Sequence, residues 1–143
     1  MKLLTLICLL LMVSGCGQNE VFLPSQYDKK YISFGYGGGI TGAVTQFYIL
    51  EDGRSYKRIS ADSLSFIGKI EKDMAQQQFQ GFDKWGMDEM SINDPGNRYF
   101  FLASNQMESR LTWGGNHEEP PKILSTFHAN LTQLIKQLSQ TEK

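Results

Sequence analysis

The sequence predicts an α+β domain: a mostly antiparallel sheet of about six strands with two helices packed on one face. Strand-like runs of β-branched and aromatic residues occur at 31–70 and again at 98–113. Asp52-Gly53 is a strong hairpin signal, and hairpins join antiparallel neighbours. Apolar residues recur at helical spacing in 73–86 and 121–138. The expected order of elements is therefore β-β-β-β-α-β-β-α.

The first half of the predicted domain contains four strands. Residues 31–34 form a short β-rich run, and 43–50 (AVTQFYIL) form a second one. The Asp-Gly turn returns the chain through 55–59, and 63–70 supplies a further strand. Gly68 weakens this last assignment, because glycine inside a strand often marks a bulge.

A helix is predicted to follow these strands. Asp73 and Gln76 have the spacing of a capping box, with aspartate in place of the usual serine or threonine. One side of the helix carries Met74, Ala75, Gln78, Phe79 and Phe82. Gly81 and Gly86 indicate that the helix frays or ends nearby.

The last third of the chain predicts a second hairpin and a second helix. The hairpin joins 98–104 to 107–113 across Asn105-Gln106, and Pro120-Pro121 then opens the helix. The apolar stripe of this helix contains Ile123, Leu124, Phe127, Leu131, Leu134, Ile135 and Leu138. Either Phe100 and Leu102 or their neighbours in sequence face this stripe, because a strand alternates its faces.

The amino terminus predicts an exported, lipid-anchored chain. Lys2 precedes an apolar run, Leu3 to Val13, which has the length of a signal-peptide core. A membrane span needs about 20 apolar residues, so the run is too short for one. Val13-Ser14-Gly15-Cys16 resembles the lipobox of bacterial lipoproteins. Cys16 is then the first mature residue, and its acyl chains form a stable anchor.

Three segments follow from these observations. Residues 1–15 are a lipoprotein signal peptide, 16–29 a lipidated amino terminus and tether, and 30–143 a single α+β domain. The chain has two cysteines, one in the signal peptide and one acylated, so we expect no disulfide and no thiolate metal site. The formal net charge of −1 argues against a nucleic-acid partner, which calls for a clustered basic face.

Residues 34–42 (FGYGGGITG) contain the spacing G-x-G-x-x-G of a dinucleotide-binding turn. In that motif the glycines open a helix, whose amino terminus faces the phosphate. Here a predicted strand follows, so we expect a strand connection and no bound cofactor. Its bare backbone is the predicted partner-binding loop. The residues of this predicted loop are Tyr36, Gly37, Gly38, Gly39, Thr41 and Gly42.

The chain resembles a set of small lipoproteins of Bacteroidota-type bacteria. The resemblance is carried by the lipobox, by 32–42 with Gly-Gly-Gly-x-Thr-Gly, by 47–50, by Asp52-Gly53 and by Pro95-Gly96-Asn97. It implies an anchored domain and brings no activity with it. Lipoproteins retained in the inner membrane carry aspartate after the cysteine in some bacteria. The glycine found there instead points to the outer membrane.

The polar candidates for chemistry are few. His117-Glu118-Glu119 is contiguous, and a solvated loop is expected because metal-binding pairs lie at i and i+4 on one helix face. Asp88-Glu89, Asn93-Asp94 and Asn97 do not match a calcium loop, and turn chemistry is expected of them. His128 is expected to be a boundary residue of the last helix. We expect no catalytic residue and no metal ligand among them.

The sequence as a whole predicts a non-catalytic binding module of the cell envelope, with a protein or a polymer as partner. Tyr36, Trp85 and Trp113 lie at the ends of predicted segments, where they either pack at the rim or form a binding patch. Two alternatives stay open. One is a structural or stress-related lipoprotein without a discrete ligand, and the other is a small hydrolase that uses Asp88, Glu89 or His117.

Overall fold

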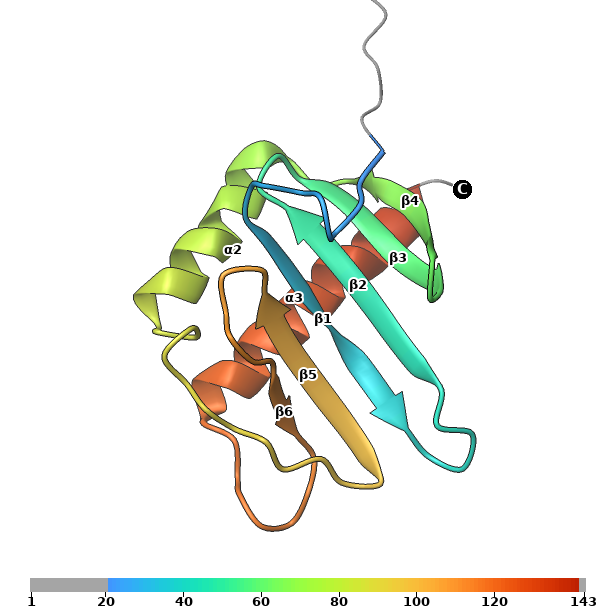
Figure 1. Ribbon diagram of the computed structural model, residues 1–143. Helices are drawn as coiled ribbons and strands as arrows, with labels where there is room; N and C mark the ends of the chain where they lie inside the picture. The colour runs from blue at the N-terminus through green and yellow to red at the C-terminus, as the bar shows by residue number, and fades with distance from the viewer. Residues whose placement is uncertain (1–20, 142–143) are drawn as a thin grey trace, which may run out of the picture.

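A computed structural model describes residues 21–141 of the chain (Figure 1). Its six strands form one sheet in the order β4-β3-β2-β1-β5-β6, and every neighbouring pair is antiparallel. The strands are β1 (Tyr31–Gly38), β2 (Val44–Leu50), β3 (Arg54–Ser60), β4 (Ser63–Lys69), β5 (Arg98–Ser104) and β6 (Leu111–Trp113). The predicted α+β class and order of elements are confirmed.

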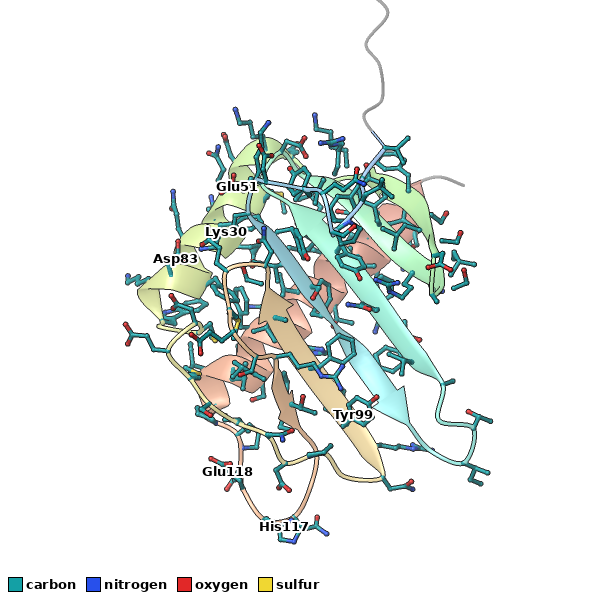
Figure 2. The ribbon with its side chains drawn as sticks, in the orientation of Figure 1. Lys30, Glu51, Asp83, Tyr99, His117 and Glu118 are labelled. Carbon is teal, nitrogen blue, oxygen red and sulfur yellow. The ribbon has the colours of Figure 1, made fainter. Side chains whose placement is uncertain are left out.

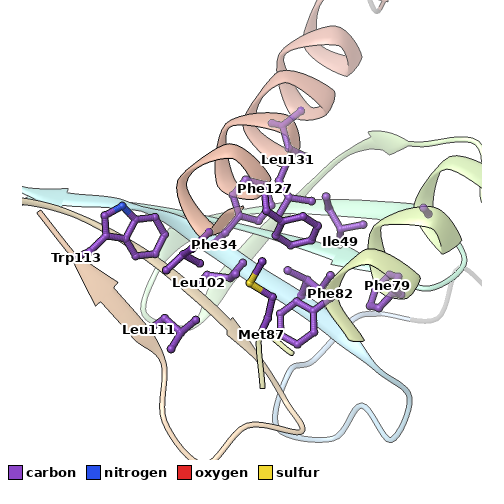
Figure 3. Close-up of a cluster of buried hydrophobic side chains, with 14 of the residues drawn as sticks. Phe34, Ile49, Phe79, Phe82, Met87, Leu102, Leu111, Trp113, Phe127 and Leu131 are labelled. Carbon is purple, nitrogen blue, oxygen red and sulfur yellow. The ribbon is translucent and has the colours of Figure 1, made fainter. Parts of the chain in front are cut away.

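Two helices, α2 (Lys72–Lys84) and α3 (Lys122–Thr141), cover one face of this sheet (Figure 1). Phe34 and Leu102 are partners in the β1–β5 register and lie beneath the helices, where Phe82 of α2 meets Phe127 of α3 (Figure 3). All four side chains are buried. Each such side chain contributes about 1.5–3 kcal/mol to folding, so this layer is the main source of stability.

The Asp-Gly turn between β2 and β3 is a further confirmed prediction. Gly53 has φ of +88° and donates a hydrogen bond to the carbonyl oxygen of Leu50 over 2.9 Å. The side chain of Asp52 accepts a hydrogen bond from the backbone N–H of Arg54 over 3.0 Å. Glycine adopts this positive φ without steric cost. Aspartate stabilises the turn because its side chain accepts a hydrogen bond from the backbone N–H two residues later.

Several predicted boundaries were wrong. β1 runs four residues past its predicted end at Phe34, and β6 has only three residues. The predicted capping box at Asp73 is absent, because Glu71 is the amino-terminal cap of α2 and makes no side-chain cap hydrogen bond. The strand β1 is longer because Gly35 and Gly37 pair on both edges, whereas sequence propensity counts glycine as a breaker.

The chain before β1 lies against the sheet face opposite the helices. Phe22 is only 3% exposed. Its ring centroid lies 5.2, 5.6, 5.5 and 4.9 Å from those of Tyr27, Tyr31, Tyr48 and Tyr56. We call residues 21–28 the strap. This part of the predicted tether 16–29 is therefore packed on the domain; Cys16 and the signal peptide lie outside the described residues.

Neither helix in the described part of the chain combines the length and the apolar content that a membrane span requires.

The strap is fixed where it leads into β1. Asn105 donates a hydrogen bond to the carbonyl oxygen of Lys29 over 2.9 Å and accepts one from the backbone N–H of Tyr31 over 3.0 Å. Lys30 forms an ion pair with Asp83 of α2 (Figure 2). These contacts join the strap, α2 and the β5–β6 connection at one end of the sheet.

Candidate functional site

The predicted partner-binding loop is divided between a strand and a turn. Tyr36, Gly37 and Gly38 lie in β1, so a loop at these positions was a wrong prediction. Tyr36 and Gly37 pair with β2 on one side and β5 on the other, and Gly38 pairs with Arg98 of β5. Gly39, Thr41 and Gly42 do lie in the connection to β2. The N–H of Gly42 donates to the carbonyl oxygen of Gly39 over 3.2 Å and closes the turn.

Close packing accounts for the glycines inside β1. A Cβ atom at Gly35 would lie 1.9 Å from the carbonyl oxygen of Thr45, and one at Gly38 would lie 2.1 Å from that of Asn97. At Gly37 it would lie 2.7 Å from the hydroxyl of Tyr99, which sits on the sheet face in front in Figure 2. Glycine is the residue that permits such approach, so these three positions have a structural reason that needs no ligand.

An exposed aromatic row lies on the other face of the same strand. Tyr36, Phe100 and Trp113 are successive partners across β1, β5 and β6, and they share the face that the helices cover. Tyr36 is 47% exposed and Phe100 is 44% exposed, whereas Trp113 is only 4% exposed. The rings of Phe100 and Trp113 are stacked, with centroids 6.0 Å apart. Two of the three rings therefore offer a large free surface.

A groove of about 730 Å³ separates this row from α3. The aromatic row forms one wall, and the other wall contains Ser125, His128, Ala129, Thr132, Gln133 and Lys136. The groove exists because α3 crosses behind the sheet obliquely, toward the β4 side (Figure 1). The apolar stripe of α3 covers Phe34 and Leu102, and the polar side of α3 faces Tyr36 and Phe100.

His128 is the buried polar residue of the groove, with 6% of its surface exposed. Its Nε2 lies 2.9 Å from the carbonyl oxygen of Gly35 and donates to it. Its ring meets those of Phe34, Phe100 and Trp113 edge to face, at 5.8, 5.3 and 5.3 Å between centroids. Burial lowers the pKa of His128 below its ordinary 6.5, and the hydrogen bond to Gly35 opposes that shift only in part. The imidazole is therefore mostly neutral at pH 7.

Two polar atoms of residues that line this groove have no hydrogen-bond partner in the described part of the chain. Nε2 of neutral His128 carries the proton, so Nδ1 is an acceptor. Neither this atom nor Nε1–H of Trp113 has a partner among the described residues. In the described chain, every fully buried side-chain nitrogen or oxygen has a hydrogen-bond partner. Because these two atoms have no partner, they are not fully buried, and solvent reaches them. Two residues that line the groove, His128 and Trp113, thus each carry a solvent-reached polar atom with no partner in the described chain.

Among the loop residues considered for chemistry, Asp94 joins its own loop to the loop that carries His117 and Glu118. Oδ2 of Asp94 accepts hydrogen bonds from the backbone N–H groups of His117 and Glu118, each over 2.9 Å, and Oδ1 lies 3.0 Å from Nδ1 of His117. The N–H of Glu118, followed by the His117 side chain, holds the pKa of Asp94 below its ordinary value. His117 and Glu118 lie on the loop at the lower end of the molecule in Figure 2. Asp94 organises this loop.

The residues named for a hydrolase are not brought together around the groove. Asp88, Glu89 and His117 do not line it, and the N–H of Glu89 is used in a turn to Gly86. Among residues 21–141, no three histidine, cysteine, aspartate or glutamate side chains are grouped as metal ligands would be. Trp85, the third aromatic singled out in the sequence, packs on Phe127, with ring centroids 5.6 Å apart.

Comparison of the chain with protein-family models finds no match, and comparison with curated proteins finds none. The resemblance to small Bacteroidota-type lipoproteins therefore remains an expectation.

Sequence reasoning identified two of the three rings in the aromatic row and missed Phe100 and His128. Tyr36 and Trp113 stood out because they lie beside glycines at segment ends. Phe100 and Leu102 formed one of the two sets of residues that could face the core. Only the register with β1 shows that Phe100 is the neighbour of Tyr36. His128 was placed on the last helix beside Phe127 and expected to be a boundary residue and not a base; the structure buries it, with 6% of its surface exposed. Its position on the core side of the apolar stripe, one residue after Phe127, was the available signal.

Proposed function

We propose that the protein is a lipid-anchored, non-catalytic binding module of the bacterial cell envelope, and that the aromatic groove is its ligand site. The observation that carries the proposal is the exposure of Tyr36 and Phe100 in a concave site. Ligand sites are typically concave and aromatic, with a few placed polar groups. The anchor rests on the lipobox that ends at Cys16.

The positions of the strap and the groove support the same proposal. The strap leads into β1, which begins at Tyr31. At about 3.3 Å per residue, Tyr36 lies about 17 Å further along the strand. An anchor at Cys16 would hold the strap end of the sheet near the membrane. The groove lies toward the other end, where a partner can reach it.

Membrane fractionation of wild type and of Cys16→Ala tests the anchor. Wild type should sediment with the outer membrane, and the variant should be released. Protease treatment of intact cells then distinguishes a surface-exposed domain, which is digested, from a periplasmic one, which is protected. A variant that fractionates like wild type would show that the lipid anchor is wrong.

Site-specific photo-crosslinking in living cells tests the groove. A photoreactive phenylalanine at Tyr36 should yield a crosslinked envelope component. The same residue at Phe66 is the matched control, because Phe66 is also half-exposed but packs against Tyr56 on the opposite sheet face. Equal crosslinking from both positions, or none from Tyr36, would favour the structural alternative without a discrete ligand.

A further inference from the structure

We infer that the groove binds a pyranose ring of an envelope glycan, with one apolar face of the sugar on the rings of Tyr36 and Phe100. This inference rests on the proposed function and adds the chemical class of the ligand. A pyranose presents C–H groups on its faces and hydroxyl groups around its edge. The groove has aromatic surface on one wall and polar side chains on the other.

The aromatic wall fits the apolar face of a sugar. Tyr36 and Phe100 are direct partners in the β1–β5 register, so their side chains lie side by side on one face of the sheet. Each keeps nearly half of its surface free. Both stand on strands paired on each side, which fix the backbone positions of the two residues before a ligand arrives. A fixed platform reduces the entropy that binding must offset.

The two free polar atoms beside this wall fit a hydroxyl group. A hydroxyl both donates and accepts hydrogen bonds. Nδ1 of His128 accepts only and Nε1 of Trp113 donates only, and the centroids of the two rings lie 5.3 Å apart. A sugar hydroxyl can donate to the first atom or accept from the second, and neighbouring hydroxyls of one sugar can serve both.

Other ligand classes fit this arrangement less well. A purely apolar side chain of a partner protein would bury both atoms without a partner, at about 1–3 kcal/mol each. A carboxylate or phosphate would pair with Lys136 on the α3 wall but would leave the rings of Tyr36 and Phe100 without an apolar contact. On the α3 wall, Gln133 and Lys136 are exposed and have no hydrogen-bond partner in the described chain. They are available to the hydroxyl groups at the edge of the sugar.

Indole NMR signals of the full-length protein test this inference, because the chain has two tryptophans and only Trp113 lines the groove. The ¹⁵N-labelled protein, in a zwitterionic detergent that contains no sugar, is titrated with chitotriose, cellotriose and maltotriose. At least one trisaccharide should shift the Trp113 signal and leave the Trp85 signal in place. Tyr36→Ala and Phe100→Ala should each weaken that binding about tenfold, and Phe66→Ala should leave it unchanged.

The inference is overturned if none of the three trisaccharides moves the Trp113 signal, or if both alanine variants bind like wild type. N-acetylphenylalanine amide is titrated in parallel as the probe for a protein partner. A shift of Trp113 by this amide alone overturns the sugar class and leaves the proposed groove intact. If no probe moves Trp113 and Tyr36 yields no crosslink in cells, the proposed function fails as well.

Discussion

His128 of α3 donates a hydrogen bond from Nε2 to the carbonyl oxygen of Gly35 in β1, over 2.9 Å. The two residues are 93 positions apart in the chain, so the bond joins the last helix to the first strand. It fixes the tautomer of the imidazole and leaves Nδ1 as the free acceptor. Protonation of this buried ring would place a charge between aromatic rings, which is costly.

The free energy of unfolding should therefore fall in mild acid because of His128. Burial lowers its pKa, so the neutral ring contributes its full stability above pH 6.5. As the pH falls from 6.5 through the lowered pKa of the native state, the unfolded chain binds a proton first and stability is lost. Chemical denaturation from pH 8 to pH 4 should show this loss in wild type. His128→Gln, which retains a donor, should lack this component; parallel pH curves would contradict the assignment.

Gly35→Ala should destabilise the domain far more than Gly42→Ala. The first substitution drives a Cβ atom to 1.9 Å from the Thr45 carbonyl oxygen, and overpacking of this kind costs about 3 kcal/mol. A Cβ atom at Gly42 meets no atom within 4 Å, so only its positive φ of 63° is penalised, at about 1 kcal/mol. Denaturation midpoints of the two variants measure the difference. Equal losses would mean that β1 shifts to accept the methyl group.

Asp94→Ala should loosen the loop that carries His117 and Glu118. A single carboxylate oxygen, Oδ2, accepts both backbone N–H groups, and alanine removes this acceptor. Hydrogen exchange at these two amides should accelerate, while amides of α3 keep their protection. Because the pKa of Asp94 is lowered, the same loop should loosen in wild type only as the pH falls below about 3.8 through the lowered pKa. Unchanged exchange in the variant would assign the loop's order to other contacts.

Phe22→Ala should release the strap while the sheet stays folded. The ring is buried among four tyrosines, and removal of such a ring costs about 3 kcal/mol of packing. Hydrogen exchange should rise in 22–28 and change little in β1. Val21→Ala is the matched control, because Val21 is almost fully exposed and contributes little packing. A global loss of protection would show instead that the strap is part of the cooperative core.

Much of the fold followed from local patterns. The Asp52-Gly53 turn and the stripe of α3 each depend on neighbours in sequence, and both are where they were predicted, except that Ile123 of the predicted stripe is exposed. The length of β1 depends on β5, which fills the space above Gly35 and Gly37 with aromatic rings. Local propensity contains no information about a partner strand 60 residues away.

The groove depended even more on long-range structure. Its aromatic row exists because three strands bring one residue each to the same level of the sheet. Its other wall exists because of the angle at which α3 crosses, which no spacing in the sequence encodes. The residue types were visible at Tyr36 and Trp113, but their shared site required the register.

With the anchor proposed at Cys16, the packed strap would also set how far the domain can move from the membrane. From Cys16 to the buried Phe22, the chain spans at most about 20 Å, and to Tyr31 at most about 50 Å. Undocking the strap would therefore enlarge the volume open to the domain roughly fifteenfold, with a matching drop in its effective concentration at the membrane surface. The packing of Phe22 among four tyrosines would thus determine the length of free chain between the anchor and the domain.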